Sequence, residues 1–170
     1  LKSSNFQQAG ANILQQISYS MCQADEYINL FGSTIIKQIN FEIAVGSNYF
    51  FEIAKIQAFR ILWKTISNSY GIPINNVHII AIPTGRNKTI YDYNNNLIRS
   101  TSECMAAILG GANSVKNFNY DSIYKNRNEF SKRIAINQLL ILKHESHIDK
   151  VKNPISGSYY ISYLVDELSK

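Results

Sequence analysis

The chain has 170 residues, 45% of them hydrophobic, and a formal net charge of +5 at pH 7. This length and composition are typical of a single globular domain, or of part of one. No stretch reaches the roughly 20 apolar residues that a membrane-spanning helix needs, and the basic residues are scattered rather than grouped, so the sequence argues against a membrane protein and against a nucleic-acid-binding one.

The first predicted element is a long helix over residues 6–31, which ends at Gly32. Its apolar face consists of residues spaced by four and three: Ala9, Ile13, Ile17, Met21 and Ala24. Residues 39–45 begin by alternating apolar and polar side chains, which predicts a short strand. Ser47 is then well placed to cap a second helix from about 48 to 68.

Residues 76–82 form a nearly continuous β-branched run, which predicts a parallel strand covered on both sides. The polar loop 83–96 leads into an amphipathic helix, because its three closing asparagines are poor helix formers whereas the residues after them are periodic. The double glycine at 110–111 is expected to close this helix in the left-handed conformation. Residues 112–118 are a weaker strand candidate.

Residues 129–146 are predicted to form a further helix. Its inward face is expected to hold Phe130, Ile134, Asn137, Leu140, Ile141 and His144. A turn with Pro154 and Gly157 precedes a last helix from about Ser158. His144 and His147 are three residues apart and could face one metal ion, but no further ligands stand nearby, so we predict no metal site.

Strand, loop and helix recur at the length that predicts parallel β/α units with right-handed crossovers. Three strands are too few to close an eight-stranded barrel. The predicted fold class is therefore α/β, as the C-terminal part of a (β/α)₈ TIM barrel, with an independent open α/β sheet as the alternative. We expect residues 1–152 to form later β/α units and residues 153–170 to form a C-terminal helix leading toward a linker.

The chain starts at Leu1 without the features of a secretory signal, so we expect a segment of a longer chain. Cys22 and Cys104 each lie in an apolar helical pattern, which predicts two buried thiols in a reducing compartment such as the bacterial cytoplasm. Arg99 and Glu103 lie four residues apart and are expected to pair along a helix surface.

In parallel β/α proteins the loops after the carboxyl ends of the strands carry function. The loop 83–96, which follows the second predicted strand, contains Arg86, Lys88, Tyr91 and Asn96. These side chains are able to hold phosphate, carboxylate or amide groups. We take these four as candidate substrate-binding or cofactor-binding residues. The commonest catalytic motifs, among them the P-loop, GxGxxG, GxSxG and HExxH, do not occur in the sequence.

Five segments, in order along the chain, together resemble one family. They are Ala9–Asn12, Ala44–Trp63, Tyr91–Gly111, Glu129–Val151 and Asn153–Leu168. The chain thereby resembles the adenosylcobalamin-dependent methylmalonyl-CoA mutases. The resemblance implies the later part of a TIM barrel, an acyl-CoA substrate threaded through it, and interconversion of methylmalonyl-CoA and succinyl-CoA by radical chemistry that the cofactor performs. The asparagine loop would then belong to the barrel mouth.

The sequence departs from the family at two motifs. Ile82–Arg86 stand where catalytic chains carry Gln-Thr-Ser-Gly-Trp, so the amide is missing. Ser114–Phe118 stand where they carry a motif like Ser-Leu-His-Thr-Asn, which puts Lys116 at the histidine; a lysine cannot act there as a neutral donor without a large pKa shift. The cobalt-ligating Asp-x-His-x-x-Gly motif is also absent around the three histidines.

These departures resemble the small, auxiliary subunit of heterodimeric members, in which the barrel keeps the fold but not the active site. The resemblance then implies no catalytic residue in this chain, a catalytic large subunit as partner, and adenosylcobalamin bound by the complex rather than necessarily by this chain. Lys116 joins the four loop residues as a candidate binding residue. The alternatives are a catalytic chain of an atypical acyl-CoA mutase and a basic nucleic-acid-binding module.

Overall fold

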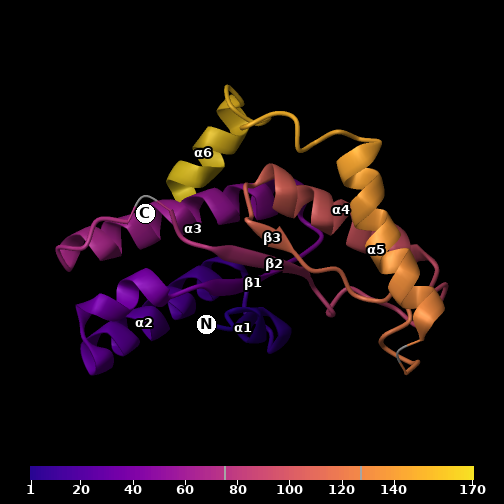
Figure 1. Ribbon diagram of the computed structural model, residues 1–170, viewed down its shortest axis with the longest axis horizontal. Coiled ribbons are helices and arrows are strands. Elements are labelled where there is room, and N and C mark those ends of the chain that lie inside the picture. The colour runs from indigo at the N-terminus through magenta and orange to yellow at the C-terminus, as the bar shows by residue number, and fades with distance from the viewer. Residues whose placement is uncertain (75, 127) are drawn as a thin grey trace.

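A computed structural model describes residues 1–74, 76–126 and 128–170. The helices are α1 (Ser4–Gln8), α2 (Ile13–Phe31), α3 (Tyr49–Ser69), α4 (Asn95–Leu109), α5 (Glu129–His144) and α6 (Tyr159–Leu168), and a 3-10 helix η1 spans Ser33–Gln38. The strands are β1 (Phe41–Val45), β2 (Ile79–Pro83) and β3 (Ser114–Val115). Figure 1 shows their arrangement.

The three strands form one parallel sheet in the order β1-β2-β3, with Phe41 opposite Ile79 and Ile80 opposite Ser114. The connections β1-α3-β2 and β2-α4-β3 are the β/α units that the periodicity predicts. The predicted α/β class with parallel strands is therefore confirmed.

One face of the sheet carries the core. Phe41 packs edge-to-face against Phe59 and Trp63 of α3, with ring centroids 4.8 and 5.0 Å apart. The same hydrophobic cluster takes in buried side chains from α2, α3, α4 and α6. On the opposite face Glu42, Ile80 and Ser114 are only half-buried, whereas Ala44 and Ile82, nearer the carboxyl ends, are buried. The prediction that β2 is covered on both sides is thus wrong at Ile80.

The predicted helix over residues 6–31 is broken into α1 and α2. Gly10 has φ +118°, a conformation that ends a helix, and Asn12 then opens α2. The Asn12 side chain accepts from the backbone N–H of Gln15 at 2.9 Å, and the Gln15 side chain accepts from the Asn12 N–H at 3.0 Å. This capping box stabilises a fresh helix start only a few residues after the break.

Two other helix ends differ from expectation. Asn48, not Ser47, precedes the first residue of α3, and no side chain caps that end. The helix α4 begins at Asn95, so two of the three asparagines are helical rather than loop residues. Of the closing glycines only Gly111 has the left-handed conformation, with φ +87°, while Gly110 keeps helical angles.

The helix α5 turns a different face inward from the predicted one. Its buried residues are Ser131, Ala135, Gln138 and Leu142, whereas Phe130, Leu140 and Ile141 are exposed. The Gln138 amide donates to the Leu97 carbonyl at 2.7 Å and to Thr101 Oγ1 at 2.6 Å. Polar contacts with α4 therefore decide the orientation of α5 more than apolar burial does.

The cysteine prediction is confirmed for Cys104 and wrong for Cys22. Cys104 is buried in α4, and burial raises the pKa of its thiol to about 12, so this thiol is unreactive. Cys22 is exposed because it lies beside, not within, the stripe through Met21 and Ala24 that packs on the core. Neither cysteine forms a disulfide.

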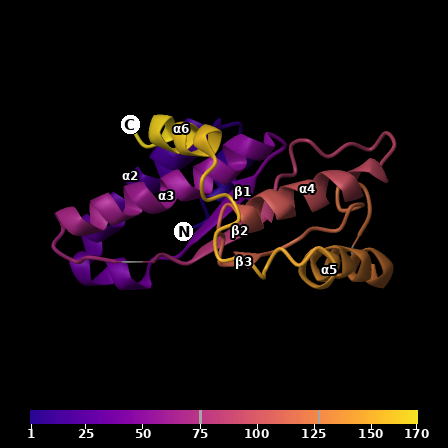
Figure 2. The ribbon, with the colours of Figure 1, turned by 90° about the horizontal axis from the view of Figure 1, so that it is seen from above.

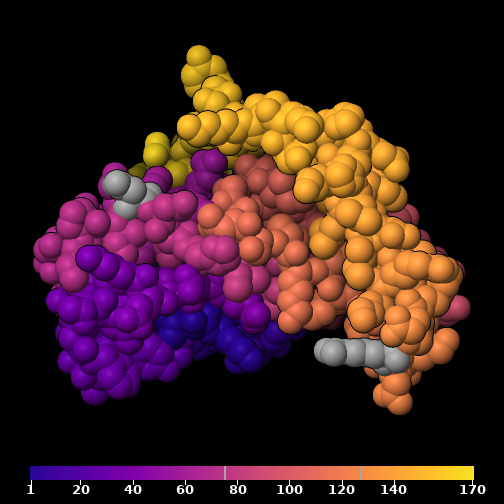
Figure 3. Space-filling view, in the orientation of Figure 1, coloured from indigo at the N-terminus to yellow at the C-terminus, as the bar shows by residue number. Residues whose placement is uncertain are grey.

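The segment that joins α5 to α6 runs back across the molecule over α3 and α4 (Figures 1 and 3). Figure 2 shows α5 and α6 well separated, with α6 beside α3 and α5 beside α4. Ser158 caps α6 through its side chain, as predicted. Within the described part of the chain, no helix combines the length and the apolar character that crossing a membrane would require.

Candidate functional site

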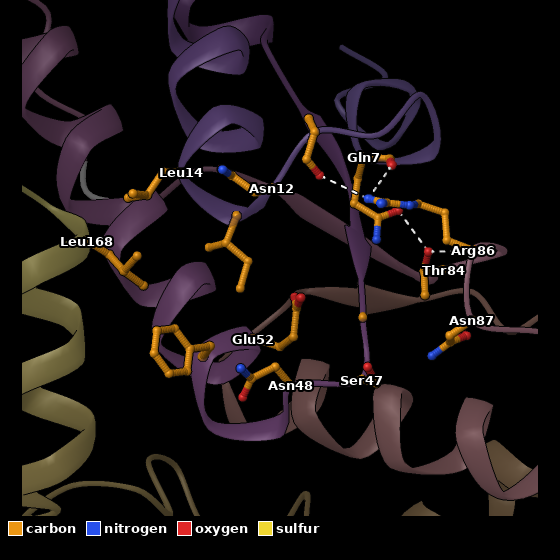
Figure 4. Close-up of a pocket in the computed structure, with 14 residues that line it drawn as sticks. Gln7, Asn12, Leu14, Ser47, Asn48, Glu52, Thr84, Arg86, Asn87 and Leu168 are labelled. Carbon is orange, nitrogen blue, oxygen red and sulfur yellow. Dashed lines mark hydrogen bonds between the residues drawn. The ribbon is translucent and has the colours of Figure 1, made fainter.

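A pocket of about 570 Å³ lies at the carboxyl ends of β1 and β2 (Figure 4). It is lined by residues of α1 and the turn after it, of the first turns of α2 and α3, of the loops after β1 and β2, and of the end of α6: Gln7, Ala11, Asn12, Ile13, Leu14, Gly46, Ser47, Asn48, Phe51, Glu52, Thr84, Arg86, Asn87 and Leu168. Its volume falls in the range of ordinary small-molecule sites. The position is the one at which parallel α/β proteins bind their ligands.

Glu52 brings a buried carboxylate to the pocket. The first turn of α3 directs it there, and the residue is only 3% exposed. Glu52 forms an ion pair with Lys55, which is itself fully buried and donates to the Ala44 carbonyl at 2.6 Å and to Gln16 Oε1 at 2.9 Å. A buried charge needs such partners, and this set ties α2, β1 and α3 together beneath the pocket.

Arg86 is the predicted binding residue that lines the pocket. Its side chain is held by the turn after α1, because Nη1 donates to the carbonyls of Gln7 and Ala11 at 3.2 Å each. Thr84 Oγ1 donates to Gln7 Oε1 at 2.8 Å and accepts from the Arg86 backbone N–H at 3.2 Å. These bonds join the loop after β2 to α1 and form one wall of the pocket (Figure 4).

Lys88 turns inward and forms a buried ion pair with Glu103 of α4, at 2.6 Å. The Asn87 amide also donates to Glu103 and accepts from Lys88 at 2.9 Å. Burial lowers the pKa of Lys88 and raises that of Glu103, in each case against the pull of the partner charge. The predicted surface pair of Arg99 with Glu103 is therefore wrong: Arg99 donates to Asn96 Oδ1 instead, at 3.0 Å.

Asn96 is fully buried and links two loops. Its Nδ2 donates to the Thr89 carbonyl at 2.9 Å and to the Tyr120 carbonyl at 3.1 Å, and its Oδ1 accepts from the Thr89 N–H at 3.1 Å. Tyr91 is 89% exposed and Lys116 is also exposed, and neither lines the pocket. The structure thus brings Arg86 to the pocket and places the other four candidates outside it.

The sequence reasoning missed the residues that give the pocket its polar character, Glu52, Gln7 and Asn12 among them. A signal for Glu52 was available. A glutamate and a lysine three residues apart, at 52 and 55, sit inside an otherwise apolar helix, and such charges require internal partners.

The histidines lie away from the pocket. His78 contacts Ser114 Oγ at 3.2 Å, near the amino ends of β2 and β3, while His144 ends α5 and His147 has φ +50° in the turn that follows. In the described ranges no group of three His, Cys, Asp or Glu side chains could hold a metal ion.

The fold and the pocket define a parallel α/β protein with a site at the carboxyl edge of its sheet. Comparison with known proteins makes the class specific. The family model described as methylmalonyl-CoA mutase matches residues 1–170. The methylmalonyl-CoA mutase small subunit of Porphyromonas gingivalis is 38% identical over 98% of this chain and 28% of its own length.

Other relatives agree. The Escherichia coli methylmalonyl-CoA mutase is 32% identical over 96% of this chain and 24% of its own length, and the Streptomyces virginiae small subunit is 31% identical over 96% of this chain and 28% of its own. The chain belongs to the methylmalonyl-CoA mutase family, which is a family of isomerases. It spans about a quarter of the length of the curated relatives that it matches.

Proposed function

We propose that this chain is part of an adenosylcobalamin-dependent methylmalonyl-CoA mutase, which interconverts methylmalonyl-CoA and succinyl-CoA, and that it belongs to the non-catalytic small subunit. The observation that carries the proposal is the 38% identity over 98% of the chain with a protein named as a small subunit. Its partners would be a catalytic large subunit and, within the complex, the acyl-CoA substrate. A reducing compartment such as the bacterial cytoplasm fits the two free thiols.

The proposal includes a TIM barrel, of which residues 1–152 supply later β/α units and residues 153–170 the helix toward a linker. Two observations favour a barrel over an open sheet. The buried core lies on one face of the sheet, whereas a doubly wound sheet has helices on both faces. In addition, the Leu1 amine donates to the Asn40 carbonyl at 2.6 Å and the Leu1 carbonyl accepts from the Glu42 N–H at 2.8 Å.

This pair of bonds at Leu1 is the pattern of a parallel bridge opposite Phe41. It supports a further parallel strand beside the outer edge of β1, as a barrel requires.

A non-catalytic role is supported by what the candidate residues do in the fold. Ile82 stands at the position of the family's missing amide and is 6% exposed. The polar groups of Lys88 and Asn96 bind partners inside the fold. The described residues also do not fit a cobalt ligand, because none of the three histidines lines the pocket. Cobalt coordination is therefore assigned to another domain or to the partner chain.

Co-expression tests this proposal. The full-length chain, produced with the large mutase subunit of its own organism, is expected to co-purify with it and with bound cobalamin. Produced alone, it is expected to give no methylmalonyl-CoA turnover when adenosylcobalamin is supplied. Efficient turnover by this chain alone would overturn the non-catalytic assignment.

The second candidate is a catalytic chain of an atypical acyl-CoA mutase, and the position of Arg86 in the pocket favours it. Arg86→Gln, which leaves the internal contacts of Lys88 and Asn96 intact, would then abolish turnover by the purified complex while the complex still forms. Unchanged turnover by Arg86→Gln would eliminate this candidate.

A further inference from the structure

The pocket contains a hydrogen-bond acceptor that the protein itself leaves unused. Glu52 is 3% exposed and lines the pocket, and its carboxylate is anchored by the ion pair between Oε2 and Lys55. Among the described residues no group donates to its other oxygen, Oε1. Oε2 is the more deeply buried of the two oxygens, whereas Oε1 can be reached from the pocket, so a group that enters the pocket and donates to this unused charged acceptor would bind favourably.

A donor stands beside this acceptor. Gln7 Oε1 is occupied by Thr84, but its Nε2 donates to none of the residues that the structure describes. Gly46 lies against both groups: a methyl group added there would be 3.1 Å from Glu52 Oε1 and 3.7 Å from Gln7 Nε2. The absence of a side chain at Gly46 therefore keeps open a small space with an acceptor on one side and a donor on the other.

The rest of the pocket lining is partly apolar and partly polar. Ile13, Leu14, Phe51 and Leu168 supply an apolar wall, while Asn12 and Asn48 add amides. Lys55 pairs with Glu52, and the guanidinium of Arg86 keeps its charge but turns Nη1 toward the carbonyls of Gln7 and Ala11. This lining suits a neutral molecule with an apolar body and one polar end.

We propose that the pocket binds a small primary carboxamide with an apolar body, and that this binding belongs to the chain itself. The carboxamide NH₂ donates to Glu52 Oε1, and its carbonyl accepts from Gln7 Nε2. A carboxylate has no N–H to donate to Glu52 Oε1, and an amine has no acceptor for Gln7 Nε2. The proposal rests on the pocket and not on the assignment as a small subunit, since a binding assay with the chain alone tests it.

The experiment measures binding of benzamide to the purified full-length chain by ligand-observed NMR, with benzoate as its charged isostere. We expect a dissociation constant for benzamide on the order of 1 mM, as suits so small a ligand. Benzoate should bind at least about tenfold more weakly, because it offers no donor to Glu52 Oε1 and would place a carboxylate oxygen against it.

A matched pair of variants locates the binding. Gly46→Ala should weaken benzamide binding at least about tenfold, because the added methyl group occupies the space between Glu52 and Gln7. Gly85→Ala is the control: its methyl group would meet only the exposed Gln8 side chain, at 3.2 Å, outside the pocket. It should bind benzamide as the unaltered chain does.

Equal affinity for benzamide and benzoate in the unaltered chain would overturn the proposal, as would no saturable benzamide binding at all. So would undiminished binding by Gly46→Ala. Because the first two results come from the unaltered chain, they do not depend on how the variant folds. Failure of the chain to pair with a large subunit would overturn only the proposed function.

Discussion

At the scale of single residues, the chain buries charge close to its pocket. The Lys88–Glu103 pair has side chains only 7% and 1% exposed, and the shifts of both pKa values have desolvation as their largest cause. Burial therefore outweighs attraction in this pair, which makes the pair a source of specific geometry rather than of net stability.

Replacing only one residue of the Lys88–Glu103 pair should destabilise the fold more than replacing both. Glu103→Leu alone leaves the Lys88 ammonium buried without its counter-ion and should lower the free energy of unfolding by about 3 kcal/mol or more. The double variant Lys88→Met with Glu103→Leu should return to within about 1 kcal/mol of the original chain or exceed it. Urea unfolding of the original chain, Glu103→Leu, Lys88→Met and the double variant completes the cycle; a double variant no more stable than Glu103→Leu would contradict this reading.

The same pair predicts a dependence of stability on pH. The folded pKa of Glu103 lies above its ordinary 4.5, so the folded state binds its proton more tightly than the unfolded state does. Its contribution to stability is therefore greatest at or below pH 4.5 and falls as the pH rises through the folded pKa. Subtracting the unfolding free energy of Glu103→Gln at each pH isolates this slope; a difference that rises with pH would refute the assignment.

At the scale of elements, α5 shows how a tertiary contact can select the face of a helix. Its sequence offers a larger apolar stripe through Phe130 and Ile141, yet the fold buries the side with Gln138 and Leu142. The amide of Gln138 reaches α4 and also accepts from Asn117 Nδ2 at 2.9 Å. A hydrophobic pattern alone predicts that an amphipathic helix exists, but not which side a neighbouring element will take.

Two leucines of α5 test this orientation. Leu142→Ala should cost about 2 kcal/mol or more, because Leu142 is 4% exposed and its removal leaves a cavity. Leu140→Ala should cost less than about 1 kcal/mol, because Leu140 is 45% exposed. Thermal and urea unfolding would measure both, and the reverse order would mean that α5 packs by its predicted face.

At the scale of the whole molecule, α6 belongs to the main hydrophobic core whereas α5 packs outside it. The main hydrophobic cluster includes Ile161, Leu164, Val165 and Leu168 of α6, although α6 lies near the end of the chain, but includes no residue of α5. The chain thus returns past α5 to complete its core with α6, which packs across α3 (Figure 1).

Hydrogen exchange should reveal this division. We expect the amides of α6 to exchange more slowly than those of α5, because opening α6 exposes core side chains, whereas α5 has to leave only α4 and the polar contacts with Asn117. Mass spectrometry of peptides from residues 131–144 and 161–168 would compare them. Equal or greater protection in α5 would place α5 within the same cooperative unit as the core.

The sequence predicts one of the pocket-lining residues of the candidate site correctly, but not the positions of the other candidate residues. That the loop after β2 carries a site residue follows from the strand order, and Arg86 does line the pocket. Lys88 lies in the same loop and Asn96 in the first turn of α4, but their partners Glu103 and Tyr120 lie further along the chain. Whether a polar side chain faces a pocket or an internal partner depends on those distant groups, so loop composition could not decide it.

The sequence by itself determined the parallel β/α order, the ends of most helices and the family, because these follow from local periodicity and from motifs read along the chain. The tertiary structure decided the break at Gly10, the inward face of α5 and the pairing of Glu103 with Lys88 instead of Arg99. Each of these depends on which residues meet across the fold. A local pattern sets what a residue can do, whereas its neighbours in space set which of those options has the lowest free energy.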